Sequence, residues 1–485
     1  MSPTLLLSIV FGYFLLLLGI AWWTSRGAGE HAFYSGERKS LWWVVAFGMI
    51  GTSLSGVTFI SVPGQVAGNA WTYFQLVLGF AIGYWIVAGV LLPLYYRLGL
   101  TSIYGYLRER FGMTSYRTGA SFFILSRLAG ATIRIFVVLN VIQHFVLDAM
   151  GVPFELTALL VMLMIVGYTL KGGVKTIVWT DTLQTLFMLG ALIGTILYVV
   201  NSDEMTDWRS MLADSGMARV LDLNWRSDTF LLKQILAGMF ITIAMTGLDQ
   251  EMMQKNLSVA TVEGSRKNMR VFSVILLGAN LLFLLLGALL YLYAGKVGIA
   301  LPERPDDVFP TLALQHFPVW LGLFFIIGLI SALFPSADGA LTALTASTCI
   351  DLIGIRDRGW DEVKQKRVRQ RVHLGMAALF MGFILYFHWL ATPSVIKTLF
   401  DIAGFTYGPL LGLFAYGLFF KGNPQERWVP VVCIAAPIIT YFLRANSETL
   451  LFGYKMGFEV LLVVAGLTMV GLHLIGQRTT SPDRD

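Results

Sequence analysis

Long apolar segments, separated by short polar ones, recur along the whole chain. Each apolar segment has roughly 17 residues or more, which is enough for a helix to cross the hydrocarbon core of a bilayer. Continuous strands with the two-residue alternation of outer-membrane barrels are absent from the sequence. We therefore predict thirteen membrane-spanning helices, at residues 4–24, 42–65, 72–97, 119–147, 154–170, 176–200, 230–253, 270–295, 318–350, 370–390, 395–421, 428–444 and 454–476.

Composition supports a lipid bilayer as the environment of the chain. Of 485 residues, 56% are hydrophobic and only 13% are charged, whereas soluble proteins carry about 25% charged residues. Soluble enzymes, nucleic-acid-binding proteins and disordered scaffolds are therefore poor interpretations, and the net charge of +6 does not indicate nucleic acid as a partner. Cys349 and Cys433 lie in apolar segments, and we expect them to be packing residues.

The distribution of basic residues between alternate loops predicts the orientation. One set of loops carries 24 lysines and arginines, Lys255 among them, and the other set carries 8. Cytoplasmic loops hold the excess of basic residues. Because thirteen is odd, we expect a multi-pass protein of the inner (plasma) membrane with its N-terminus outside and its C-terminus in the cytoplasm. Short surface helices are expected in the two longest outer loops, about 201–229 and 296–317.

Three cations fall inside predicted spans. Lys233 lies at the outer end of its span, where its side chain can reach the membrane surface. Arg127 and Arg134 lie seven residues apart, on one face of the fourth span. A buried arginine costs at least a few kcal/mol, so it faces a partner or a water-filled cavity. For Arg127 we favour an ion pair or a clamp on carbonyl groups, and for Arg134 either such a clamp or a contact with substrate.

Helix-breaking residues concentrate in two spans. The second span combines Pro63 with four glycines and five hydroxyl residues, which favours local unwinding, although small residues also serve helix packing. Irregular backbone within a membrane persists only where it is buried in protein or lines a cavity. The ninth span is a second candidate for a break, because Pro335 removes a backbone donor just before Ser336 and Asp338.

Acidic residues within the spans are few, and such residues mark ion or proton pathways. Asp338 lies deep in an apolar stretch. Asp181 and Asp249 lie nearer to span ends, where each could instead be a helix-terminal charge or an ion-pair partner. Hard oxygen ligands of this kind suit Na⁺. The six histidines are scattered along the chain, which argues against a membrane enzyme.

These residues carry a resemblance to the sodium:solute symporter family, which includes bacterial sugar, proline and sialic acid carriers. Four features match over nearly the whole chain. They are the thirteen-span layout, the G-G-x-x-x-x-x-W-T-D-x-x-Q element at 172–184, the G-x-D-Q-x-x-x-Q element at 247–254, and the hydroxyl-rich ninth span that ends in C-I-D at 349–351.

The resemblance implies an all-α polytopic membrane protein of the leucine-transporter type, with two inverted five-helix repeats and a monomeric functional unit. Substrate would bind midway, at the broken second and seventh spans. The expected organisation is an extra N-terminal helix and cytoplasmic loop (1–41), the first repeat (42–200), an extracellular loop (201–229), the inverted second repeat (230–421), and two C-terminal helices with a short tail (422–485).

The resemblance also implies site residues. A sodium site would use the carbonyls of Gly51, Leu54 and Ala332 and the hydroxyl of Ser336. Some members have a second sodium site, which here would combine Asp181 with Ser336, Asp338 and Gly339. The implied substrate contacts are Ser53, Ser55, Thr58 and Gln75, and Arg134 is the best match for an arginine that holds a carboxylate. Many members have serines where this chain has Pro335 and Gly339, so the usual sodium geometry is altered.

We therefore expect a sodium-coupled secondary symporter that imports a small polar organic solute by alternating access, with Na⁺ as the coupling ion. Because Arg134 needs a partner, the expected solute is anionic, such as an acidic sugar or a monocarboxylate. Proton coupling through Asp181 or Asp338 is the first alternative. A transporter-like membrane sensor and a membrane enzyme are the others; the tail after Gln477 has eight residues, and we expect a longer signalling extension in a sensor.

Overall fold

The computed structural model describes residues 3–25, 40–170, 174–355, 357–390 and 395–477. The predicted cytoplasmic loop at 26–39, the Gly172-Gly173 pair of the W-T-D element and the tail at 478–485 lie outside these ranges.

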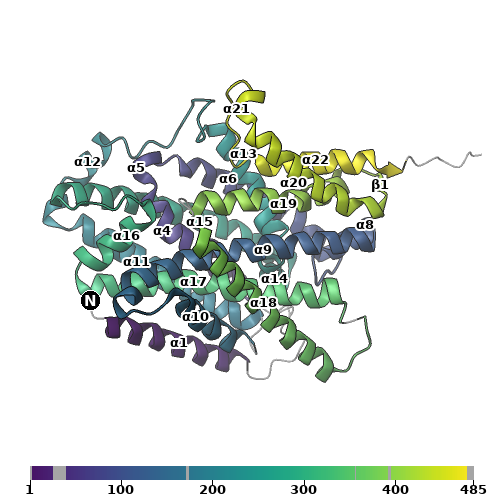
Figure 1. Ribbon diagram of the computed structural model, residues 1–485, viewed down its shortest axis with the longest axis horizontal. Coiled ribbons are helices and arrows are strands. Elements are labelled where there is room, and N and C mark those ends of the chain that lie inside the picture. The colour runs from purple at the N-terminus through teal and green to yellow at the C-terminus, as the bar shows by residue number, and fades with distance from the viewer. Residues whose placement is uncertain (1–2, 26–39, 171–173, 356, 391–394, 478–485) are drawn as a thin grey trace, which may run out of the picture.

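The described chain is almost entirely helical, and most of its long helices run along the long axis of the molecule (Figure 1). The helices are α1 (Pro3–Ser25), α3 (Trp42–Ser53), α4 (Gly56–Gly64), α5 (Val66–Asn69), α6 (Tyr73–Ile86), α7 (Leu92–Arg97), α8 (Gly105–Arg110), α9 (Met113–Ile142), α10 (Phe154–Thr169), α11 (Val174–Val200), α12 (Trp208–Asp214), α13 (Leu231–Thr242), α14 (Gln250–Leu257), α15 (Val262–Val297), α16 (Val308–Thr311), α17 (Val319–Ser347), α18 (Glu362–Leu390), α19 (Val395–Phe419), α20 (Val429–Ala445), α21 (Ser447–Leu450) and α22 (Val460–Leu474). A two-stranded antiparallel ribbon pairs β1 (Asn423–Pro424) with β2 (Gly476–Gln477).

The predicted spans coincide with these helices. Among the described residues, eight helical segments are long and apolar enough to cross a membrane, and two further spans are bent helix pairs. Three shorter apolar helices, at Ser8–Trp23, Phe154–Thr169 and Val460–Leu474, match the remaining predicted ranges. The all-α polytopic architecture is thus confirmed, while the total of thirteen spans stays a prediction.

The second and seventh spans are broken, as expected. The axes of α3 and α4 differ by 56°, and Leu54 and Ser55 form the break between them. The seventh span bends by 66° between Leu231–Gly247 and α14. Asp249 caps the second half of that span, because its side chain accepts a hydrogen bond from the Met252 amide. Both breaks lie within the bundle, where protein rather than lipid surrounds the irregular backbone.

The expectation of a break in the ninth span is wrong. The α-helix α17 continues without interruption through Pro335. Every residue from Gly328 to Ser347 is buried, so neighbouring helices enclose the proline on all sides. Such packing tolerates a missing backbone donor, which would bend or break a helix exposed to lipid.

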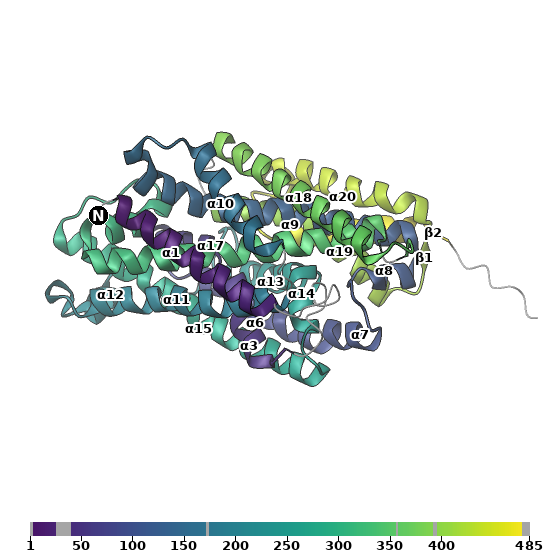
Figure 2. The same cartoon turned by 90° about the horizontal axis from the view of Figure 1, so that it is seen from below.

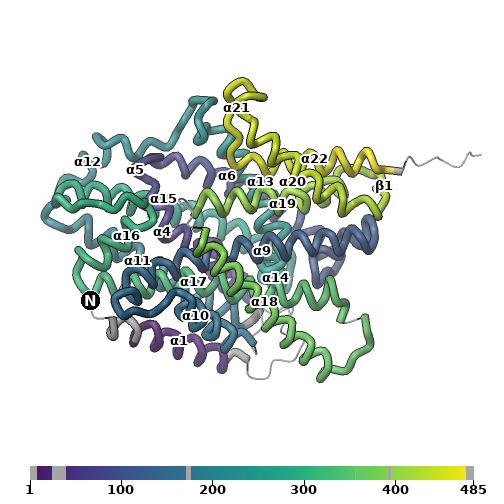
Figure 3. The backbone as a smooth tube through the Cα atoms, in the orientation of Figure 1, coloured from purple at the N-terminus to yellow at the C-terminus, as the bar shows by residue number. Residues whose placement is uncertain are grey.

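The segments that connect the long helices lie in two groups at opposite ends of the molecule. The start of α1 lies at the same end as α12 and α16, whereas α8 and β1 lie at the opposite end (Figures 1 and 3). The short helices α12 and α16 occur in the two long loops in which helices were expected. Helix α1 crosses the outside of the bundle (Figure 2) and buries Tyr13, Leu17 and Ala21.

Small residues allow the two halves of the bundle to approach closely. Gly79 of α6 and Gly238 of α13 face each other: a Cβ atom on Gly238 would collide with the Leu76 carbonyl and would lie 3.2 Å from the Gly79 Cα. Backbone contact of this kind is how membrane helices pack without a hydrophobic driving force between them.

We predict that Gly238→Ala forces α13 away from α6 and destabilises the protein by about 1–3 kcal/mol, the usual effect of overpacking. The matched control is Gly278→Ala in α15, since a Cβ there would meet nothing within 4 Å. Thermal unfolding in detergent measures the difference. Equal melting temperatures for the two variants would contradict the close α6–α13 contact.

Candidate functional site

A cavity lies beside the α3–α4 break, and it contains about 660 Å³ of space not filled by atoms. Helices α3, α4, α6, α9, α13, α14 and α19 and the π-helical segment Ile243–Gly247 contribute side chains to it. The lining residues are Thr52, Ser53, Ser55, Val57, Thr58, Tyr73, Phe80, Tyr84, Arg127, Arg134, Ile241, Thr242, Met245, Thr246, Met252, Ile396, Leu399 and Phe400.

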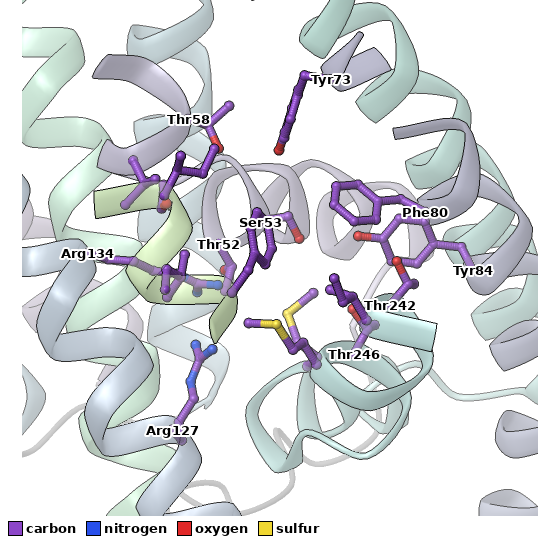
Figure 4. Close-up of a pocket in the computed structure, with 18 residues that line it drawn as sticks. Thr52, Ser53, Thr58, Tyr73, Phe80, Tyr84, Arg127, Arg134, Thr242 and Thr246 are labelled. Carbon is purple, nitrogen blue, oxygen red and sulfur yellow. The ribbon is translucent and has the colours of Figure 1, made fainter. Parts of the chain in front are cut away.

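The cavity has a polar wall and an aromatic wall. Arg134 reaches in from α9 toward the break, and the aromatic rings of Phe80 and Tyr84 lie on the opposite side (Figure 4). Hydroxyl groups of serine and threonine surround the space on both sides of the break and on the seventh span. An apolar pocket with a few converging polar groups is the usual form of a small-molecule site.

Four of the five predicted substrate contacts, Ser53, Ser55, Thr58 and Arg134, line this cavity. Gln75 does not. Its amide nitrogen donates to the Thr229 carbonyl at 2.9 Å, and its amide oxygen accepts from the Asp222 amide at 3.2 Å. The structure therefore gives Gln75 a role in anchoring the 201–229 loop to α6.

The two arginines of α9 have different surroundings. Arg127 is ion-paired with Glu251, and its Nη1 lies 3.7 Å from Asp249 Oδ2. The expectation of a structural ion pair for Arg127 is confirmed. Arg134, about two turns further along the same face of α9, is partly open to the cavity, and its Nε has no hydrogen-bond partner. Among the described residues, no carboxylate forms an ion pair with Arg134.

A further buried cation, Lys255, was missed by sequence reasoning. Lys255, assigned to a cytoplasmic loop, is instead buried in α14 with 2% of its side chain exposed. Its Nζ lies 2.6 Å from Asp181 Oδ2 and 3.1 Å from Glu251 Oε1, and it also donates to the Thr52 hydroxyl. The one signal in the sequence is the i, i+4 spacing of Glu251 and Lys255, which favours an ion pair on a helix.

Lys233 also departs from expectation. It is buried rather than exposed, and its ammonium donates to the Lys455 carbonyl at 2.7 Å and lies 3.5 Å from Glu459. The ring of Tyr454 covers it at 4.4 Å. A partner from the segment before α22 therefore replaces water around this cation.

The predicted sodium ligands lie where two features of the structure suit a cation. Gly51 lies in the last turn of α3 and Leu54 lies in the break, where carbonyl oxygens lack partners in the same helix. Helix α17 packs against this turn: a Cβ built on Gly51 would lie 3.5 Å from Pro335 Cγ. The adjacent Ser336 hydroxyl is fully buried and has no hydrogen-bond partner. Ala332 lies one turn earlier on the same face of α17.

The Ser336 hydroxyl of α17 and the Gly51 and Leu54 carbonyls at the end of α3 are hard oxygen groups for which no hydrogen-bond partner is found among the described residues. Leaving such a hydroxyl unsatisfied costs about 1–3 kcal/mol. A bound Na⁺ would remove that cost, and Pro335 would contribute no ligand. The residues present therefore fit a sodium ion held between α3 and α17, with the ion as cargo.

Asp338 interacts electrostatically with Lys255 and Asp181, but it forms no ion pair among the described residues. Its Oδ2 accepts a hydrogen bond from the Tyr168 hydroxyl at 2.8 Å, and its Oδ1 accepts one from the Gly339 amide at 2.5 Å. The glycine at position 339 also has a packing reason, because a Cβ there would collide with the Glu251 carboxylate. The departure from the serine of many family members is thus linked to the presence of Glu251.

Comparisons with known proteins agree with the geometry. The family model of the sodium:solute symporter family matches residues 33–421. The sodium/sialic acid symporter SiaT of Proteus mirabilis is 20% identical over 99% of this chain and 97% of its own length. Sodium-coupled monocarboxylate transporter 1 of Xenopus laevis is 26% identical over 86% of this chain and 66% of its own length.

The solved structures confirm the fold. The outward-open state of a Na⁺-coupled sialic acid symporter superimposes with a TM-score of 0.78 at 18% identity, covering 97% of each chain. Mhp1, a nucleobase-cation-symport-1 family transporter, superimposes with a TM-score of 0.52. With a family model that matches most of its length, this multi-pass membrane protein is a transporter rather than an enzyme, and Na⁺ is its coupling ion. The chain belongs to the sodium:solute symporter family.

Proposed function

We propose that this protein imports a carboxylate-bearing polar solute, an acidic sugar or a monocarboxylate, together with Na⁺. The observation that carries this proposal is the Arg134 guanidinium, which faces the cavity without a carboxylate partner from the described chain. A guanidinium binds a carboxylate through two parallel hydrogen bonds. The names of two relatives, a sialic acid symporter and a monocarboxylate transporter, point to acidic solutes as well.

The rest of the cavity favours the acidic sugar over a very small acid. Ser53, Ser55 and Thr58 would bind hydroxyl groups near Arg134, and Thr242 and Thr246 would do so across the cavity. The aromatic wall supplies an apolar surface for the faces of a sugar ring.

Sodium would be held by the carbonyls of Gly51, Leu54 and Ala332 and by the Ser336 hydroxyl. The same α3–α4 break presents Ser53 and Ser55 to the cavity, so an ion that fixes the break also fixes the solute contacts. By reciprocity, bound solute raises the affinity for sodium by the same factor. This shared segment would couple the two cargoes during alternating access.

The proposed setting is the inner membrane, with the N-terminus outside, the C-terminus in the cytoplasm and a monomer as the functional unit. Two observations support the orientation. The loops with few basic residues hold α12 and α16, and these helices lie at the same end as the start of α1. Helix α8, which carries Arg108 and Arg110, lies at the opposite end, as the positive-inside rule requires.

Asp338 keeps proton coupling as a second candidate. Its carboxyl group is fully buried, and its oxygens accept hydrogen bonds from Tyr168 and Gly339. No ion pair within the described residues includes it. A carboxyl group in such a position can carry a proton across a membrane.

Uptake into proteoliposomes tests the function directly. A panel of sialic acid, monocarboxylates, neutral sugars and amino acids is offered with an inward Na⁺ gradient, with an inward proton gradient, and with neither. We expect concentrative uptake of an acidic solute with the Na⁺ gradient alone. Uptake driven only by protons would replace sodium coupling with the Asp338 alternative, and uptake of neutral solutes only would overturn the carboxylate proposal.

We predict that Ser336→Ala weakens Na⁺ binding by roughly 1–3 kcal/mol, about 5- to 150-fold, because one oxygen ligand is lost. Binding of ²²Na⁺ to purified protein measures the change. Ser273→Ala is the matched control, since its hydroxyl donates to the Arg270 carbonyl of its own helix. The ligand role of Ser336 is refuted if Na⁺ affinity, and solute affinity at saturating Na⁺, stay within about twofold of the unmodified protein.

We predict that Arg134→Ala abolishes uptake of the acidic solute, because removal of one partner of a desolvated charge pair costs roughly 2–5 kcal/mol. Arg134→Lys should impair uptake strongly, since an ammonium cannot reproduce bidentate geometry. Na⁺ binding should persist in both variants. The control is Arg209→Ala, an exposed arginine whose guanidinium lies over the Trp208 ring. Normal transport by Arg134→Ala would make Arg134 a structural residue.

A further inference from the structure

The surroundings of Lys255 are those of a bound cation. Its Nζ has oxygen neighbours on three different helices: Asp181 Oδ2 of α11 at 2.6 Å, Thr52 Oγ1 of α3, and Glu251 Oε1 of α14 at 3.1 Å. Thr52 Oγ1 also lies 3.1 Å from Asp181 Oδ2, so two of the oxygens adjoin each other as ligands of one ion do. The side chains of Lys255, Asp181 and Glu251 are 0–3% exposed.

The charge distribution of this cage requires a cation. Two carboxylates, Asp181 and Glu251, approach the same point in a region without solvent access. Arg127 lies on the other carboxylate oxygen of Glu251, so it does not neutralise Asp181. Without Lys255, Asp181 would be a buried anion without a cationic partner among these residues, which is strongly unfavourable. A mobile Na⁺ could satisfy the same oxygens, because carboxylate and hydroxyl ligands suit it.

Glu251 also excludes an arrangement in which a side chain at position 339 of α17 completes a cation site at Asp181. Its carboxylate fills the space next to Gly339, where any side chain on α17 would collide with it. Helix α17 therefore offers no hydroxyl from position 339 toward Asp181. Of the other two α17 residues implied for that site, Asp338 accepts a hydrogen bond from Tyr168, and Ser336 is the proposed ligand of the ion between α3 and α17. Glu251 thus takes the place of ligands from α17 and orients the ammonium of Lys255, which is four residues away on the same helix.

We propose that Lys255 acts as a built-in cation that takes the place of a second sodium ion at Asp181. The protein then carries a single Na⁺, the ion between α3 and α17. This inference extends the proposed function, since it fixes how many sodium ions accompany the solute. Because a tethered ammonium cannot leave with the cargo, the Asp181 cage adds no driving force from the sodium gradient. Lys255 is a positioning residue that fastens α14 and α11 to Thr52, beside the α3–α4 break.

Counting bound sodium ions tests this proposal. The number of ²²Na⁺ ions per chain is measured at saturating Na⁺ with purified full-length protein, at about pH 8, where free carboxyl groups are ionised. The variants are Lys255→Met, which removes the charge at similar length, Lys255→Arg, which keeps the charge, and the double variant Lys255→Met with Asp181→Asn. Thermal unfolding confirms that each variant is folded.

We expect the Lys255→Met protein to bind one sodium ion more than the unmodified protein, rising from about one to about two, since the uncompensated Asp181 then needs a mobile cation. Lys255→Arg and the double variant should both bind the original number. The extra ion should also make the melting temperature of Lys255→Met depend more steeply on Na⁺ concentration than that of the unmodified protein.

Two results would overturn the proposal: two sodium ions on the unmodified protein, or an unchanged number on folded Lys255→Met. If Lys255→Met fails to fold, the single variant Asp181→Asn is used instead. If Lys255 is the cation at Asp181, this variant binds as many sodium ions as the unmodified protein. If a sodium ion occupies that place, the variant binds one ion fewer. An error in the proposed sodium site at Ser336 would give a different result. In that case the unmodified protein would bind no sodium ion, while Lys255→Met would still gain one.

Discussion

The neutralisation of charge inside the bundle is the constraint on which the rest of the structure depends. Arg127 and Lys255 lie between Asp181, Asp249 and Glu251, and all five side chains are at most 3% exposed. Removing one member of such a network leaves an uncompensated buried charge, at a cost of about 3–5 kcal/mol. The network therefore joins α9, α11 and α14 firmly, and it determines where the broken seventh span ends.

With this network fixed, the α3–α4 break is the segment whose conformation can respond to bound ligands. On one side, Thr52 is held by Lys255 and Asp181. On the other, Ser53 and Ser55 face the cavity, and the carbonyls of Gly51 and Leu54 remain available to an ion. Because solute and sodium would bind the same few residues, coupling needs no long-range pathway, only a segment whose conformation both ligands favour.

The sequence allowed prediction of those features that follow from local composition. Apolar length located the helices, and the density of glycine, proline and hydroxyl residues located the break in the second span. Features that depend on tertiary neighbours were missed. Lys255 lies just beyond an apolar run, so it resembled a loop residue, and only its contacts with Asp181 and Thr52 show it to be buried. Pro335 failed to break α17 because surrounding helices enclose it.

Arg127 is held in an ion pair whereas Arg134 faces the cavity, and together with Lys255 they bear on the proposed solute. Arg127 and Lys255 form ion pairs with Asp181, Asp249 and Glu251, and the unpaired Arg134 brings this set to three positive and three negative charges before any ligand binds. Asp338 is close enough to Lys255 and Asp181 to interact with both, so the set stays neutral with Asp338 in its protonated form. One Na⁺ and one carboxylate would enter as a neutral pair and preserve the balance. A neutral solute would leave the charge of the ion uncompensated in a region of low dielectric constant, which is unfavourable. The proposed single sodium ion and the proposed anionic solute would both follow from this charge balance.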